Sequence, residues 1–236
     1  MEVVDYFKEL NDRTHSIFEE SMAKQSELGI AHHISACLFE FASNVADPSE
    51  RSILASVSAQ VESATVSACQ GMYRQAFGSL RLALEMGVAA AHFSTNKIEL
   101  EEWLSDRFDI KWSSITDTDS GVLSRRFARA FFPEFEDDLE TRQADASKLY
   151  RSLSRFVHGN QGTWRECGIK LVFNSSLLDE YFKKLGEVKD LLLFVLCCRY
   201  LKSFSTDQLE SLVFIPDEIG HLGYVRTFFG GPKEEK

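Results

Sequence analysis

Apolar residues recur at intervals of three and four along most of the chain, which is the spacing of one face of an α-helix. This pattern predicts a series of long helices, over residues 3–28, 31–46, 48–70, 71–93, 134–157 and 175–204. Gly29 is expected to end the first helix. Asp47 and Pro48 predict a sharp start for the third, because aspartate accepts hydrogen bonds at an N-cap and proline fits the first helical turn.

The helix predicted over 71–93 differs from the others in its composition. Alanine and glycine fill much of the space around an apolar stripe formed by Tyr73, Phe77, Leu80, Leu84 and Val88. We therefore expect this helix to be the central and most enclosed one. Shorter helices are expected over 99–108 and 122–131, and the Ser-, Thr- and Asp-rich segment 111–121 between them is expected to be an ordered loop.

Two segments depart from the helical pattern. Ile169, Leu171 and Phe173 occupy alternate positions, which predicts a short β-hairpin near 165–174. The tail beyond residue 205 is expected to form a short helix and irregular structure. Since no repeat or flexible linker divides the chain, we predict one all-α domain over 1–236. It would be an irregular up-and-down bundle of about six to eight helices, with its core at about 48–204 and the segments 3–46 and 205–236 packed on it.

Composition and charge narrow the class of protein. Only 13 Gly and 4 Pro occur in 236 residues, which favours long helices, and the formal charge of −10 argues against a surface that coats nucleic acid or anionic membrane. The longest apolar run is too short to span a bilayer, and the amino terminus has no basic segment followed by an apolar one. We expect no membrane association, no secretory signal and a cytoplasmic protein whose five cysteines are reduced core thiols.

Common catalytic signatures do not occur in the sequence. It has no Gly-rich phosphate loop, no GxSxG elbow, no HExxH helix and no paired CxxC motif, so no cofactor and no metal are expected. His32 and His33 are neighbours on a helix, about 100° apart, and therefore do not share one face as metal ligands four residues apart would.

One polar segment near the end of the helix 134–157 carries candidate chemistry. Arg151, Arg155 and His158 are spaced so that they fall within about 60° of one another on a helix, while apolar residues occupy the opposite side. The segment 141–170 contains six basic and two acidic residues, a net charge of +4, so the rest of the chain carries −14. The acidic protein therefore contains a local cationic stripe.

This stripe has three interpretations. Guanidinium groups bind phosphate oxygens in a bidentate manner and stabilise negative charge in a transition state, and imidazole transfers protons near neutral pH. The residues could thus support metal-independent cleavage of RNA, in which the 2′-hydroxyl attacks the adjacent phosphate, or they could only hold a phosphate. Alternatively, basic residues at a helix C-terminus complement the helix dipole, and Arg151 and His158 would contact only acids such as those within 134–140.

The pattern Arg151-x6-His158 near the end of a long helix resembles the R-x4-6-H motif of the HEPN superfamily. The wider arrangement, GMYRQAFGSLRLALE followed about 65 residues later by YRSLSRFVHGN, is also similar to HEPN-like bacterial proteins. The resemblance covers about 57–204. It implies an endoribonuclease of the toxin or defence type, in which the motifs of two chains form one cleft in a homodimer and cut single-stranded RNA without a metal. By position, Arg151 would bind phosphate and His158 would transfer protons.

Four further residues are candidates for substrate binding. Arg155 lies on the same stripe, and Asn160 follows it at the end of the segment. Arg81 and Glu85 share a face of the central helix, where they either form a structural ion pair or border the same cleft. The predicted partners are a second copy of the chain and either RNA or a cognate protein. A non-catalytic module that binds RNA, a nucleotide or a partner protein is the alternative function.

Overall fold

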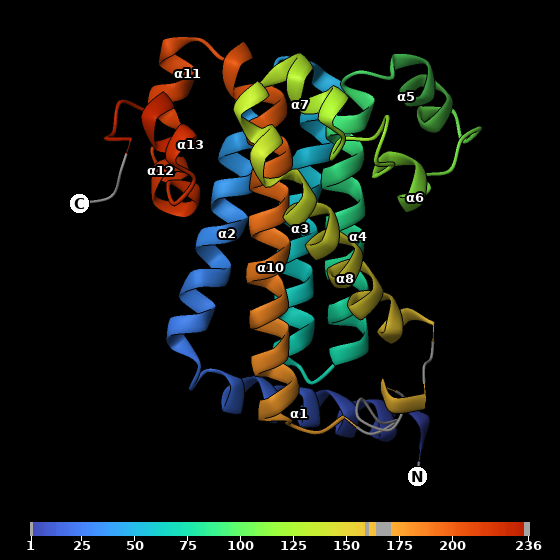
Figure 1. Ribbon diagram of the computed structural model, residues 1–236. Helices are drawn as coiled ribbons and strands as arrows, with labels where there is room; N and C mark the ends of the chain where they lie inside the picture. Colours follow the sequence, from blue (N-terminus) through green and yellow to red (C-terminus); the bar gives the residue numbers. More distant parts are fainter. Residues whose placement is uncertain (1, 159–160, 164–170, 234–236) are drawn as a thin grey trace.

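The computed structural model describes residues 2–158, 161–163 and 171–233, and this described part contains helices, turns and loops but no strand (Figure 1). Six helices have 19 residues or more: α1 (Val3–Ser21), α2 (Gln25–Asn44), α3 (Pro48–Cys69), α4 (Tyr73–Phe93), α8 (Leu139–Val157) and α10 (Ser175–Tyr200). The predicted all-α class is confirmed.

The bundle is built around α4, as its composition predicted. In Figure 1, α2, α3, α4 and α10 run side by side, α8 crosses in front of α4, and α1 lies across one end. α4 packs against α3, α8 and α10. Phe77, Leu80 and Leu84 on α4 are completely buried. Gly87 completes the contact with α10, because a Cβ at this position would lie 2.4 Å from Leu192 Cδ2.

The predicted boundary between the first two helices is wrong. α1 ends at Ser21 and α2 begins at Gln25, so Gly29 lies inside α2 instead of ending a helix. The Ser21 hydroxyl is buried and donates to Ile17 O at 2.8 Å and to Cys69 O at 3.0 Å, which anchors the end of α1 beneath α3. Gly29 is exposed, and a glycine on an exposed helix face weakens a helix by about 1 kcal/mol without breaking it.

The described ranges contain more helices than the six to eight predicted, because the loops and the tail carry short ones. These are α5 (Lys97–Leu104), α6 (Trp112–Ile115), α7 (Arg125–Phe131), α11 (Thr206–Ser211), α12 (Phe214–Ile219) and α13 (Gly223–Phe228). The segment predicted as one helix over 134–157 starts as the 3-10 helix Pro133–Asp138, which places Phe135 in the core. The loop predicted over 111–121 contains α6 and is otherwise ordered by turns.

The β-hairpin predicted near 165–174 is not found in the part of it that the structure describes. Residues 171–174 have no strand and lead directly into α10, while 164–170 lie outside the described residues. The Asn174 side chain accepts a hydrogen bond from Leu177 N at 3.1 Å and so caps α10. Alternation over so few residues also suits an extended connection between two helices.

One hydrophobic core extends from Ala31 in α2 to Val225 in α13. α1 contributes little to the interior, with Ile17 and Ser21 as its buried residues. Among the described residues, none of the helices combines the length and the apolar character that a bilayer crossing requires.

Four cysteines are buried and free, as the sequence predicted, whereas Cys167 lies outside the described residues. Burial raises the pKa of Cys37 and Cys69 to about 11 and that of Cys198 to about 12. Buried thiols of this kind stay protonated near neutral pH, so these three are core residues and not nucleophiles.

Candidate functional site

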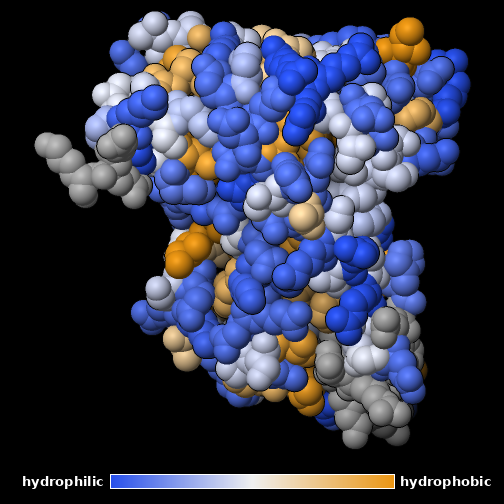
Figure 2. Space-filling view, in the orientation of Figure 1, coloured by the Kyte–Doolittle hydropathy of each residue, from blue (hydrophilic) through white to orange (hydrophobic). Residues whose placement is uncertain are grey.

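The stripe predicted on α8 is a solvent-exposed ridge, which we call the α8 ridge and define as Arg151, Arg155 and His158. Leu149, Leu153 and Phe156 are buried on the opposite side of the helix. Over this front face of the molecule hydrophilic residues predominate (Figure 2). The helical period therefore placed all three polar side chains on one accessible face, with Arg151 and His158 about 10 Å apart along the helix axis.

The side chains of the α8 ridge form no ion pair within the described part of the chain. The side-chain hydrogen bond of Arg151 is local, from Nε to Ser147 O at 3.1 Å on its own helix. Two of the acids of 134–140, which one interpretation made partners of the ridge, bind other cations: Glu134 contacts Lys202 at 2.9 Å, and Glu136 contacts Arg129 at 2.7 Å. The ridge thus carries positive charge that no carboxylate of the described chain neutralises.

Contacts from distant residues fix the end of α8. Arg74 on α4 donates from Nη1 to Phe156 O at 2.6 Å, and Thr163 donates from Oγ1 to Arg155 O at 2.9 Å. His158 N closes the last turn on Ser154 O at 3.0 Å. The last carbonyls of a helix have no partners within it, so these bonds replace water and hold the backbone of His158 in place. Asn160 lies outside the described residues.

The predicted pair Arg81–Glu85 is an ion pair at the seam between α4 and α8. Arg81 Nη2 lies 3.0 Å from Glu85 Oε1, and the two side chains are only 17% and 19% exposed. Tyr150 on α8 joins them: its hydroxyl accepts from Arg81 at 2.5 Å and donates to Glu85 at 2.9 Å. Burial raises the pKa of Tyr150 above its usual value, so the phenol stays protonated and keeps this bond.

The seam thus orients α8 relative to α4. Trp112 of α6 covers the network by stacking on the Tyr150 ring, with 4.4 Å between the ring centroids and 4° between the planes. The observed contacts of Arg81 and Glu85 are structural, and their contact with a substrate stays a prediction. Since Tyr150 precedes Arg151 directly, the network sets the rotation of α8 that turns the ridge outward.

Aromatic packing supports the C-terminal half of α8. The rings of Phe77 and Phe156 are stacked, with 3.9 Å between centroids and 17° between planes. Tyr181 of α10 meets Phe77 edge-on at 6.1 Å, and its hydroxyl lies 2.8 Å from Thr65 Oγ1. This cluster joins four helices directly beneath the ridge.

An exposed apolar strip lies beside the ridge, formed by Gly78 and Leu82 of α4 and Val157 of α8. Leu82 and Val157 are 43% and 45% exposed, and a Cβ on Gly78 would lie 4.0 Å from Val157 Cγ2. Gly78 and Leu82 are four residues apart and therefore share a face of α4. The strip is small, but the glycine permits close approach of another helix.

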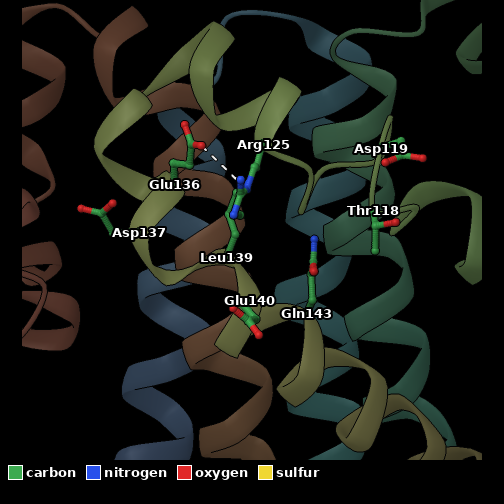
Figure 3. A pocket seen from close by; sticks show the side chains of 8 residues that line it. All are labelled: Thr118, Asp119, Arg125, Glu136, Asp137, Leu139, Glu140 and Gln143. Atoms are coloured by element: carbon green, nitrogen blue, oxygen red, sulfur yellow. Dashed lines mark ion pairs between the residues drawn. The ribbon is translucent and has the colours of Figure 1, made fainter.

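A cavity of about 500 Å³ beside the 3-10 helix Pro133–Asp138 and α7 carries four acids, Asp119, Glu136, Asp137 and Glu140. Arg125 lies 3.8 Å from Glu136, and Figure 3 shows Asp119 and Asp137 on opposite sides, pointing away from each other. The acids do not converge on one point. Within residues 2–158, 161–163 and 171–233, no group of three or more His, Cys, Asp or Glu side chains has an arrangement that could hold a metal ion.

Comparison with known proteins adds no relative: no family model, no curated protein and no solved structure matches this chain. The resemblance to HEPN proteins therefore stays a prediction. The sequence located the ridge through its helical period, but it contained no signal for the bond from Arg74 to Phe156 O or for the contact of Tyr150 with Arg81. These contacts join residues 82 and 69 positions apart.

Proposed function

We propose that the protein is a metal-independent endoribonuclease that acts as a homodimer, with Arg151 binding the scissile phosphate and His158 transferring protons. The observation that carries the proposal is the α8 ridge: two arginines and a histidine on one exposed face, unpaired within the described chain and held on a helix whose end is fixed. Arg155 would supply a second phosphate contact. Positive charge left without a carboxylate partner is available to a phosphodiester.

The proposed reaction needs only groups of this kind. The 2′-hydroxyl of RNA loses its proton and attacks the adjacent phosphorus, while the bond from phosphorus to the 5′-oxygen breaks and that oxygen takes up a proton. The products are a 2′,3′-cyclic phosphate and a 5′-hydroxyl. Arg151 would stabilise the negative charge that develops on the phosphate oxygens, and imidazole would move the protons.

A second copy of the chain would complete the site. The α8 ridge is an open surface on one chain, and two such ridges facing each other would enclose a strand of RNA between two Arg–His pairs. The apolar strip of Gly78, Leu82 and Val157 lies next to the ridge and supports a contact between chains at this face. With −10 on the whole protein, binding of RNA would depend on this confined cationic cleft.

The proposal is tested with purified protein and a fluorescent single-stranded RNA in excess EDTA. Cleavage should continue in EDTA and should fall by about 10²–10³-fold in Arg151→Ala, since one transition-state contact is worth that factor. Arg107→Ala is the matched control, because Arg107 is also exposed and has no ion pair among the described residues. Absence of cleavage of any single-stranded RNA, or equal rates in the two variants, would contradict the proposal.

A non-catalytic module that binds RNA is the second candidate. The observation that favours it is the exposure of Arg151, Arg155 and His158 in the described part of the chain. This candidate predicts saturable binding without turnover, lost in Arg151→Ala. Binding should weaken as the salt concentration rises. For a single strand, the slope of the logarithm of the binding constant against the logarithm of the salt concentration should become smaller by about 0.7 for each phosphate contact that a variant loses. Cleavage products in the EDTA experiment would exclude it.

A further inference from the structure

A second cavity, of about 500 Å³, lies at the opposite end of the bundle from His158. It is enclosed by the C-terminal end of α4, by α5, by the connection 105–124 and by α7, in the upper right part of Figure 1. Its lining combines a buried histidine, phenyl rings and two cations. None of the ridge residues lines it, so it is a separate site.

A buried histidine forms the floor of the cavity and contacts the carboxylate of the lining. His92 is 8% exposed, and its Nε2 lies 2.7 Å from Glu99 Oε2. Asn96 Nδ2 lies 3.4 Å from His92 Nδ1 and also donates to His92 O at 2.9 Å. Glu99 is the one carboxylate among the lining residues, and its contact with His92 holds it at the floor.

Two cations stand at the rim without a partner. Lys111 and Arg126 are exposed, and neither forms an ion pair or a side-chain hydrogen bond within the described residues. With a single carboxylate in the lining, the cavity has a net positive charge in a protein of −10. Such a local excess of positive charge attracts an anion.

Three phenyl rings form the apolar part of the wall, beside polar residues such as Ser114 and Ser120. Phe127 is buried in the wall, and Phe108 and Phe131 are half-buried. Phenyl faces pack against planar rings in stacked or edge-on geometry. A cavity of this size, in which phenyl rings lie beside charged and polar groups, has room for a small molecule with both a ring and a charge.

Hydrogen bonds within the loop order one side of the rim. Asp117 Oδ1 accepts from Ser120 N at 2.8 Å and from Ser120 Oγ at 2.9 Å, and these bonds lower the pKa of Asp117. Gly121 is required at the turn, because a Cβ there would lie 2.4 Å from Asp117 N and 2.7 Å from Ile115 O. These contacts hold Ser120 at the rim of the cavity.

We propose that this cavity binds a small aromatic anion, with its planar ring against Phe108, Phe127 and Phe131 and its carboxylate or phosphate between Lys111 and Arg126. The cations supply the charge, the phenyl rings supply the apolar contact, and the Ser114 hydroxyl, which donates to no other described group, supplies a hydrogen bond. The site goes beyond the proposed nuclease function and does not depend on it, because it shares no residue with the α8 ridge.

In the test, the full chain is titrated with 1-naphthoate and, separately, with 1-naphthyl phosphate, and binding is measured by calorimetry. Inorganic phosphate and 1-naphthalenemethanol are the controls, because each has only the charge or only the ring. At least one naphthyl anion should bind about tenfold more tightly than both controls, and Arg126→Ala should weaken that binding about tenfold. Comparison of the two anions distinguishes a carboxylate site from a phosphate site.

Matched variants separate this site from its surroundings. Arg125→Ala removes the neighbouring arginine of α7, which lines the acidic cavity instead, and should leave binding unchanged. Ala130→Phe adds a ring at the exposed rim and should block binding, and Lys111→Ala provides a second test of the charge. Cleavage of RNA, where present, should be the same in all of them. Failure of both naphthyl anions to bind below about 1 mM, or equal weakening by Arg125→Ala and Arg126→Ala, would overturn the proposal.

Discussion

His158→Ala should reduce the rate of RNA cleavage in EDTA by about 10²–10⁴-fold, the usual contribution of a positioned proton-transfer group. His158 is exposed, and its backbone is held by the bond to Ser154 O and by the nearby contact from Arg74 to Phe156 O. Removal of the imidazole therefore leaves the fold intact and acts on the chemistry. The measurement is the initial rate of cleavage of a fluorescent single-stranded RNA.

The control for this variant is His32→Ala. His32 is also exposed, lies on α2 and has no ion pair among the described residues. Its replacement should leave the rate unchanged. Binding of the same RNA should change little in His158→Ala, because Arg151 and Arg155 remain. Equal rates in the two histidine variants would contradict the proposed role of His158.

Phe77→Ala should lower the free energy of unfolding by about 3–5 kcal/mol, the range for truncation of a buried phenylalanine. Phe77 is completely buried, stacks on Phe156 of α8 and meets Tyr181 of α10, so its loss opens a cavity where α4, α8 and α10 meet. The measurement is urea-induced unfolding followed by circular dichroism, with the midpoint and the slope both fitted.

Phe39→Ala is the matched control for this second prediction. Phe39 lies on α2 and is 57% exposed, so its truncation should change the free energy of unfolding by less than about 1 kcal/mol. A loss below about 1 kcal/mol in Phe77→Ala would show that the cluster beneath the ridge is not the close-packed centre described above. Such a result would also remove the main packing support for α8.

Local signals predicted the elements whose causes lie within one or two turns of chain. Asp47 caps α3 as expected, with its Oδ1 accepting from Ser49 N at 2.9 Å and Glu50 N at 3.0 Å. The alanine-rich composition around Phe77 identified α4 as the enclosed helix, since small residues allow neighbours to approach on all sides. The helical period alone placed Arg151, Arg155 and His158 on one exposed face.

Other features depend on contacts that no local signal reports. The first helix ends at Ser21 because its hydroxyl reaches Cys69 O, 48 residues away, and not because of the glycine at position 29. The ion pair of Arg81 and Glu85 was one of two options from the sequence. Its attachment to Tyr150 emerges only when α4 and α8 are packed together. The cavity around His92 likewise combines residues from four segments.

The chemistry of the RNA ends tests the central claim most directly. Products formed in EDTA are analysed for their termini by mass spectrometry, with a substrate that carries a single 2′-deoxy nucleotide at the cleaved position as the comparison. Attack by the 2′-hydroxyl, assisted by Arg151 and His158, predicts 2′,3′-cyclic phosphate and 5′-hydroxyl ends and no cleavage of the 2′-deoxy substrate. Products with 5′-phosphate and 3′-hydroxyl ends, or cleavage of the 2′-deoxy substrate at the same rate, would contradict it.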